Sequence, residues 1–217
     1  MIISTQKPWE QILDALTGYQ RVFLVGCNLC ASLCQTGGEK EVLQMKKDLE
    51  TSGKLVVGYR IVEAACHHLE TKKELRGARK MVEKADAILS LGCGAGSQAI
   101  ASFIEKPVFT AVDTLFLGNV ERWGNFSEVC QQCGDCILNQ TGGICPVTKC
   151  PKGLLNGPCG GMNKGKCEIN PERDCVWVEI YNILKRQGRI EAFKKTIPAR
   201  DHSKREQPGK VVLKREE

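Results

Sequence analysis

Continuous apolar runs recur along the first half of the chain, and segments with apolar residues at helical spacing separate them. The apolar runs occupy residues 21–26, 54–62, 85–92 and 106–113. The helix-like segments occupy residues 5–20, 38–53, 72–85 and 97–105. Uninterrupted short apolar runs are typical of strands that are buried on both faces of a parallel sheet. The alternation predicts an α/β fold, with a small parallel, Rossmann-like sheet and right-handed crossovers over residues 1–124.

The pattern changes in the second half of the chain. Between residues 113 and 129 the apolar spacing loosens, so we place the domain boundary near residues 123–126. Residues 125–195 are expected to form a cysteine-rich module that ends in a helix over 176–189, where apolar residues form a stripe. Residues 196–217 are polar and charged and contain two prolines, which predicts a flexible tail.

Cysteine dominates the second module, which holds eight of the 13 cysteines of the chain. They are Cys130, Cys133, Cys136, Cys145, Cys150, Cys159, Cys167 and Cys175. Few large apolar residues lie between them, and glycine, proline, asparagine and lysine are frequent. A segment of this composition cannot fold mainly by burying hydrocarbon, so it needs a covalent or metal cross-link.

The spacing of these cysteines indicates which cross-link to expect. Three of them form a C-x2-C-x2-C run from Cys130 to Cys136, and prolines follow Cys145 and Cys150. This pattern resembles the cysteine runs of bacterial ferredoxins, and eight thiolates are what two [4Fe–4S] clusters require. Zinc also takes four thiolates, so one cluster with one zinc site, or zinc alone, remain as alternatives.

A second group of cysteines belongs to the predicted sheet. Three of the expected strands are followed by cysteines, at Cys27, Cys66 and Cys93, and Cys30 and Cys34 follow in the turn after the first strand. Because the carboxyl ends of parallel strands meet at one edge, we expect five thiols around one crevice. Four would hold a third [4Fe–4S] cluster, and the spacing does not say which is the fifth.

Two other interpretations of this crevice remain open. His67 and His68 directly follow Cys66 and could supply a ligand, although supporting roles around a metal site are commoner. The segment Gly92–Ser97 lies between a strand and a helix, and Asp113 follows about 20 residues later, as in dinucleotide-binding sites. That fingerprint requires glycine where Ser97 stands.

Composition narrows the location and the partners. With 42% hydrophobic residues in 217, the chain can bury a core, but it contains neither a membrane-length apolar run nor a secretory signal, which predicts a cytoplasmic protein. In that reducing compartment an odd number of cysteines favours metal or redox chemistry over disulfides. The net charge of +6 is spread along the chain and only 6% of residues are aromatic, so no nucleic-acid partner is expected.

Conventional catalytic groups are scarce. The chain has three histidines, and none lies in a recognisable nucleophile–base motif. An electron-transfer role is therefore favoured over acid–base or covalent catalysis.

Several motifs of the chain resemble a known family. The segments CQQCGDCIL, TGGICPVTKCPKGLLNGPCGG, GKCE and CVWVEIY are similar to the methylenetetrahydrofolate reductase C-terminal domain family. Upstream, GCNLCASLCQTGGEKEV and LGCGAGSQ resemble the small cysteine-rich subunit of the two-subunit, acetogen-type enzymes of this kind.

The resemblance implies an iron–sulfur electron-transfer subunit without a folate site of its own. In such complexes the larger catalytic subunit holds FMN and folate, and a ferredoxin-type or heterodisulfide-reductase-like protein exchanges electrons with the small subunit. The cluster ligands that the resemblance implies are Cys27, Cys30, Cys34, Cys93 and the eight cysteines from Cys130 to Cys175. Cys66 is added from its position at a strand end alone. A zinc-stabilised, non-redox assembly subunit and a nucleotide-binding oxidoreductase are the alternative functions.

Overall fold

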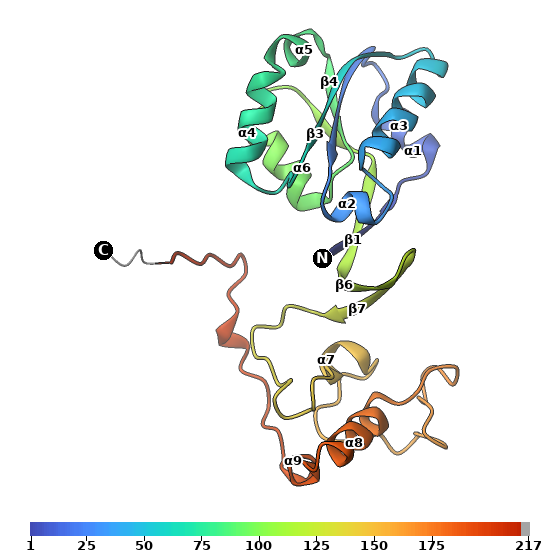
Figure 1. The fold of residues 1–217 in the computed structure, drawn as a ribbon, viewed down its shortest axis with the longest axis vertical. Helices are drawn as coiled ribbons and strands as arrows, with labels where there is room; N and C mark the ends of the chain where they lie inside the picture. The colour runs from blue at the N-terminus through green and yellow to red at the C-terminus, as the bar shows by residue number, and fades with distance from the viewer. Residues whose placement is uncertain (214–217) are drawn as a thin grey trace. The chain divides into compact units, whose positions relative to one another are not determined.

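The computed structural model describes residues 1–213, and the chain divides into two compact units (Figure 1). The first unit ends at Phe126 and the second begins at Ser127. The first contains a complete sheet with helices on both faces, whereas the second consists mostly of loops around one helix.

A four-stranded parallel sheet forms the centre of the first unit. Its strands are β2 (Arg21–Cys27), β3 (Leu55–Val62), β4 (Ala87–Ser90) and β5 (Val108–Thr110). Their order in the sheet is β3-β2-β4-β5, and each neighbouring pair is parallel. The prediction of an α/β fold with a Rossmann-like parallel sheet is therefore confirmed. From β2 the chain adds β3 on one side, and then crosses back to add β4 and β5 on the other side. The crevice at the carboxyl ends of β2 and β4, where the strand order switches, is where ligands bind in open α/β sheets.

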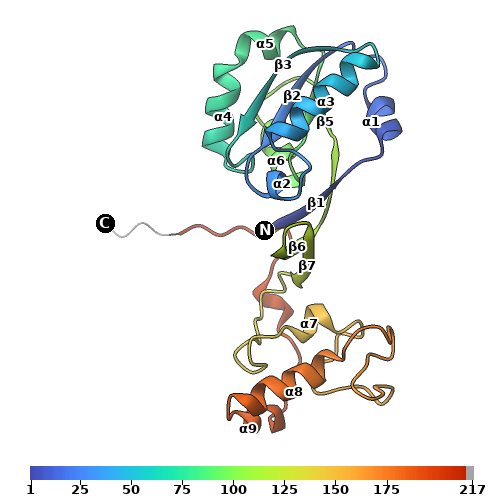
Figure 2. The ribbon, with the colours of Figure 1, turned by 45° about the vertical axis from the view of Figure 1, so that its right-hand side comes forward.

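Helices cover both faces of this sheet (Figures 1 and 2). The helices are α1 (Trp9–Ala15) and α3 (Glu39–Thr51) on one face, and α4 (His68–Gly77), α5 (Arg79–Lys84) and α6 (Gly94–Ala101) on the other. Alternate residues of β2 point to opposite faces, so Leu24 packs with α1 and α3, and Phe23 packs with α4 and α6. Both side chains are completely buried, which explains why the run is apolar throughout.

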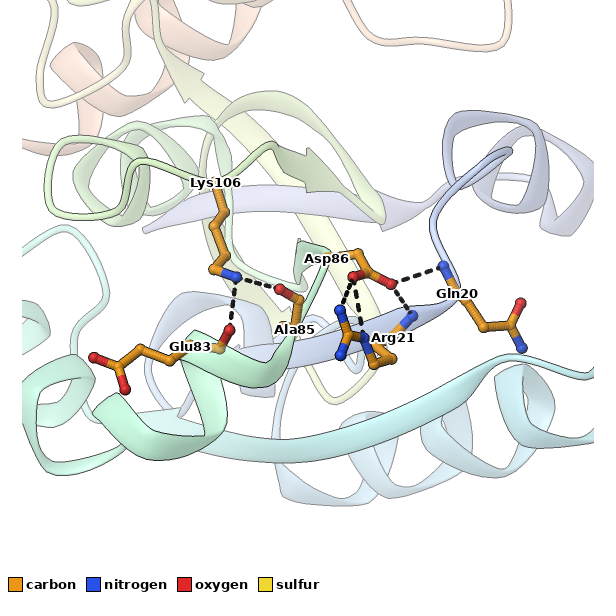
Figure 3. A network of polar contacts seen from close by, with 6 residues as sticks. All are labelled: Gln20, Arg21, Glu83, Ala85, Asp86 and Lys106. Carbon is orange, nitrogen blue, oxygen red and sulfur yellow. Dashed lines mark hydrogen bonds and ion pairs between the residues drawn. The ribbon is translucent and has the colours of Figure 1, made fainter.

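Polar contacts fix the amino-terminal edge of the sheet (Figure 3). The Asp86 carboxylate, just before β4, accepts hydrogen bonds from the backbone N–H groups of Gln20 and Arg21, at 3.2 and 2.7 Å, and from the Arg21 guanidinium at 2.6 Å. These bonds, led by the one from the guanidinium, lower the pKa of Asp86 to about 2. The Lys106 ammonium donates to the carbonyls of Glu83, at 2.8 Å, and Ala85.

A second sheet was not expected from the sequence. It contains β1 (Ile2–Gln6), β6 (Val112–Arg122) and β7 (Asn125–Cys130) in the order β1-β6-β7, and β1 runs antiparallel to β6, with Ile2 opposite Leu117. The helix predicted over residues 5–20 therefore begins only at Trp9, after Pro8. Residues 113–129, interpreted as loosely patterned, are mainly strand, and their partly exposed side chains obscure the alternation.

The second unit has a small hydrophobic core. Its helices are α7 (Pro146–Lys149), α8 (Val176–Arg186) and α9 (Ile190–Lys194), followed by a 3-10 turn, η1 (His202–Lys204). The buried residues of the core all belong to α8 and its N-cap: Cys175, Val176, Trp177, Ile180 and Leu184. The Trp177 indole N–H donates to the Leu154 carbonyl at 3.1 Å, so the loops are attached to this helix.

Part of the segment predicted to be a flexible tail contacts the cysteine-rich loops. The Asn156 side chain exchanges two hydrogen bonds with the backbone of Ile197, at 2.9 and 2.7 Å. The Asp135 carboxylate accepts from the Asp201 N–H at 3.2 Å and the Lys204 ammonium at 2.6 Å. Residues 197–205 therefore pack within the second unit, and residues 214–217 of the predicted tail lie outside the described part of the chain.

Candidate functional site

The cysteines of the chain are the candidate ligands, and all 13 carry free thiols. They range from buried to exposed, and they fall into one group in each unit.

The first group lies at the carboxyl edge of the parallel sheet. Cys27 is the last residue of β2 and Cys93 caps α6 directly after the loop that follows β4, and both are buried. Gly92, in the loop after β4, lies close to the residues that end or follow β2 and β3. A Cβ placed on Gly92 would lie 3.8 Å from the Cys27 Cβ and 3.7 Å from the Ala65 Cβ. The switch point between β2 and β4 is therefore lined by cysteine.

Cys66 and Cys30 complete this group. Cys66 lies in the turn after β3, which the buried Thr71 hydroxyl holds by donating to the Ala65 carbonyl at 2.7 Å. Burial raises the pKa of the Cys66 thiol, and the nearby charges of Cys93, Cys27 and Cys30 add to the rise. Cys27 ends β2, Cys30 and Cys66 follow the ends of β2 and β3, and Cys93 follows β4, so all four lie near the same edge of the sheet. We call Cys27, Cys30, Cys66 and Cys93 the sheet-edge thiols.

Cys34 faces a different part of the first unit. The short helix α2 (Cys30–Leu33) ends just before it, and its thiol donates to the Ile2 carbonyl of β1 at 3.7 Å. The resemblance implied Cys34 as a ligand, and the strand-end argument alone suggested Cys66. In this structure Cys66 lies with the other sheet-edge thiols, whereas Cys34 lies against β1.

The two histidines that follow Cys66 have structural contacts. The His67 ring nitrogen Nδ1 accepts the Glu70 N–H at 3.3 Å and so caps α4. The His68 ring packs edge-on against Phe103, with 5.4 Å between ring centroids.

The groups that a dinucleotide would contact are partnered within the protein. The Gly94 N–H donates to the Thr114 hydroxyl at 2.8 Å, and the Ser97 hydroxyl donates to the Ser90 hydroxyl at 2.9 Å. Asp113, the candidate ribose-binding carboxylate, forms an ion pair with Lys7. These contacts give the nucleotide interpretation no support.

In the second unit, the C-x2-C-x2-C run forms a tight loop. Gln132 and Gly134 have φ of +54° and +80°, and the Gln132 N–H donates to the Cys130 sulfur at 3.3 Å. The Arg200 guanidinium donates to the Cys133 carbonyl at 3.4 Å. A Cβ on Gly134 would lie 2.9 Å from the Arg205 Cβ, so the C-terminal segment covers this loop closely.

The last cysteine of the run, Cys136, and the next cysteine along the chain, Cys145, have different surroundings. Cys136 is exposed. Cys145 precedes α7, and its sulfur lies 3.6 Å from the Thr148 hydroxyl.

The remaining four cysteines of the second unit line one cavity of about 30 Å³. They are Cys150, Cys159, Cys167 and Cys175, and we call the space they line the four-cysteine cavity. The Cys159 thiol donates to the Glu168 carboxylate at 3.2 Å, and Lys152 forms an ion pair with the same carboxylate. No sequence pattern predicts this ion pair, because it depends on how the loop folds back.

The fit to a metal can be judged from the donor set. Within residues 1–213 no three or more His, Cys, Asp or Glu side chains are arranged as a formed metal site. Four cysteines line one cavity in the second unit, and four lie near the carboxyl edge of the parallel sheet. Soft thiolate ligands suit iron–sulfur clusters and zinc, so the residues present fit both.

The sequence comparisons identify the second unit more closely than the first. In residues 1–213 no helix combines the length and apolarity needed to span a membrane. Searches of curated proteins and of solved structures found no match. Residues 109–203, which include all eight cysteines of the second group, match the family described as "Methylene-tetrahydrofolate reductase C terminal".

Proposed function

We propose that the chain is the iron–sulfur electron-transfer subunit of a methylenetetrahydrofolate reductase complex. It relays electrons between an external donor or acceptor and the FMN of the folate-binding catalytic subunit. The observation that carries this proposal is the matched segment 109–203, which contains eight free thiols and only a small hydrophobic core. The sheet-edge thiols supply a third set of four.

The thiols have surroundings that favour metal binding. When bound, [4Fe–4S] clusters accept and release single electrons. Cys93 and Cys175 are the N-cap residues of α6 and α8, so the helix ends fix the positions of these two candidate ligands. The Gln132 N–H already donates to the Cys130 sulfur, and bonds of this kind raise the reduction potential of a cluster.

Electron transfer also explains the division of labour in the proposed complex. The catalytic subunit supplies the flavin, which converts single electrons into the two-electron reduction of the substrate. This chain then needs only its clusters, a ferredoxin-type or heterodisulfide-reductase-like donor, and a docking surface.

Metal analysis and flavin reduction test the proposal together. The full chain, purified without oxygen, should contain iron and sulfide in equal amounts and lose its brown colour with dithionite. The reduced chain, mixed with the catalytic subunit, should bleach the FMN absorbance. A colourless protein without iron, or reduced chain that leaves FMN oxidised, would refute electron transfer.

A matched pair of variants tests the site in the first unit. Cys66→Ser should remove about one cluster, or about four iron atoms per chain, because Cys66 lies with the other sheet-edge thiols. Cys34→Ser should leave the iron content unchanged, because its thiol faces β1. The opposite result would restore the ligand set implied by the resemblance.

A zinc-stabilised assembly subunit is the second candidate, because four cysteines line one cavity of the second unit and zinc also takes four thiolates. Such a subunit would bind the catalytic partner without moving electrons. Zinc without iron in the purified chain, together with stable complex formation, would favour it.

A further inference from the structure

We propose that a groove between the helices α4 and α5 and the residues that follow α6 binds an acidic segment of the catalytic partner subunit. The groove lies within the first unit, on the sheet face that α4, α5 and α6 cover (Figure 1). We call it the α4–α5 groove. The inference rests on the proposed function, which requires a stable partner subunit.

Two parts of the chain form the walls of this groove. One wall is α4 and α5, which follow each other with Ala78 as the cap between them. The other wall is the segment just after α6. Its Phe103 ring lies 5.4 Å from the His68 ring of α4, and the Lys72 ammonium lies 5.6 Å from the centroid of the Phe103 ring. These contacts hold the second wall beside α4.

The floor of the groove is apolar. Leu75 is buried beneath it, whereas Val82, Phe103 and Ile104 pack against the same core cluster and are only partly buried. Part of the hydrophobic core of the first unit is therefore in contact with solvent here. An apolar side chain from a partner would remove this surface from water, which favours binding.

The rim of the groove is basic. Lys72, Arg76 and Arg79 line it, and residues 68–84 contain six Lys or Arg residues against three Glu. Arg79 is paired with Glu83 at 2.7 Å. Within residues 1–213, no ion pair joins Lys72 or Arg76 to a carboxylate. Unpaired cations around an apolar floor are complementary to an acidic segment that carries an apolar side chain.

Charge argues against an occupant from this chain. Lys and Arg outnumber Asp and Glu in the second unit as well, so neither that unit nor a second copy of the chain complements the rim. Nucleic acid would match the rim but not the floor. Phe103 is the single aromatic side chain among the described lining residues, and bases need aromatic side chains on which to stack.

The groove suits a lasting partner better than a transient electron carrier. None of its described lining residues is a cysteine, so electrons need not pass through it. Interfaces of permanent complexes are also more apolar than those of transient redox encounters. The lasting partner in the proposed complex is the catalytic subunit, and we therefore assign the groove to it.

Charge reversal in the full chain tests the rim. Affinity for the purified catalytic subunit is measured by biolayer interferometry over a range of salt concentrations. Arg76→Glu should weaken binding at low salt by about tenfold or more and reduce its dependence on salt, because it places a like charge against the acidic segment. Arg76 is exposed and Lys47→Glu makes the same charge change at an exposed position of α3, on the other sheet face, so Lys47→Glu should leave the affinity unchanged. Equal affinities of the unmodified and Arg76→Glu chains overturn the inference.

Truncation of the floor separates a protein partner from a purely anionic one. Ile104→Ala should weaken binding about fivefold and leave the salt dependence as it is, because it removes apolar contact without changing charge. A single-stranded DNA oligonucleotide serves as the anionic probe. If Ile104→Ala binds the catalytic subunit normally and the oligonucleotide binds the groove more tightly than that subunit, the inference is overturned.

Binding and electron transfer fail in different ways. A catalytic subunit that binds through the groove, but whose FMN the reduced chain leaves oxidised, supports the inference and refutes the proposed electron transfer. FMN that is bleached by the Arg76→Glu chain at unchanged affinity supports electron transfer and overturns the inference. A catalytic subunit that does not bind the unmodified chain also overturns it.

Discussion

Removing metal should unfold the second unit and leave the first folded. The two core clusters of the first unit contain twelve and eleven buried residues, whereas the core of the second contains five. Its large apolar members, Val176, Trp177, Ile180 and Leu184, contribute about 1.5–3 kcal/mol each, or about 6–12 kcal/mol together. A structural zinc ion in a small domain contributes about 10–16 kcal/mol, which is as much as this core.

The consequence for stability follows from these magnitudes. Folded domains retain only about 5–15 kcal/mol of net stability, so a second unit that holds metal as proposed should unfold when the metal is removed. A net loss of about 5 kcal/mol or more should lower the amide-exchange protection of α8 by a factor of about 10³ or more. The sheet of the first unit depends on its hydrophobic core, so we expect its protection to remain.

Hydrogen exchange followed by mass spectrometry measures both units in one sample. The full chain is compared before and after treatment with a chelator and a reductant, with metal loss verified by elemental analysis. Peptides that cover 176–186 should exchange rapidly after treatment, and peptides that cover 39–51 serve as the internal control. Unchanged protection of 176–186 in metal-free protein would refute the reasoning.

Three further predictions concern the sheet edge, the acid dependence and the C-terminal segment. Gly96→Ala should destabilise the first unit by about 1–3 kcal/mol in a urea titration, because its Cβ would lie 3.0 Å from that of Ala65. Gly92→Ala meets its nearest atom only at 3.5 Å and should cost less, so the reverse ranking would contradict the geometry. The pKa of Asp86 is about 2 when folded, below its usual 3.8, so its stabilising contribution is present above pH 4 and is lost as the pH falls towards 2. Asp86→Asn should therefore lower the melting temperature of the first unit at pH 6 more than at pH 2, and an equal loss at both would show that the carboxylate charge is not the cause. Truncation after Ile197 removes the cover of the C-x2-C-x2-C loop and should accelerate iron loss in air, whereas equal rates in the full and truncated chains would exclude a protective role.

The parallel sheet was predictable because each of its strands is a local signal. Since β2 is covered on both faces, residues 21–26 are apolar without interruption, and the pattern alone identifies them. The pairing of β1 with β6 joins residues more than 100 positions apart, and both strands are partly exposed. Half-exposed strands carry a weak local pattern, so the sequence pattern alone did not predict this second sheet.

The candidate site was predictable to a similar degree. That the cysteines bind metal stays a prediction. The strand-end argument expected Cys27, Cys66 and Cys93 at one edge of the sheet, and they end or follow β2, β3 and β4. Spacing could not separate Cys66 from Cys34, because the direction of a thiol depends on the turn that holds it. The four-cysteine cavity depends on backbone bonds within a loop rich in glycine and proline, and no periodic pattern encodes such bonds.

The orientation of Cys34 has a practical consequence. If the sheet-edge thiols are bound to metal, Cys34 is the cysteine of the first unit that keeps a free sulfur, and it is partly exposed. An alkylating reagent should therefore modify only Cys34 in a loaded protein, and also the accessible Cys30 and Cys66 in an empty one, whereas Cys27 and Cys93 are buried in both. Peptide mapping of the label would then count bound ligands one residue at a time, without colour, spectroscopy or a functioning partner.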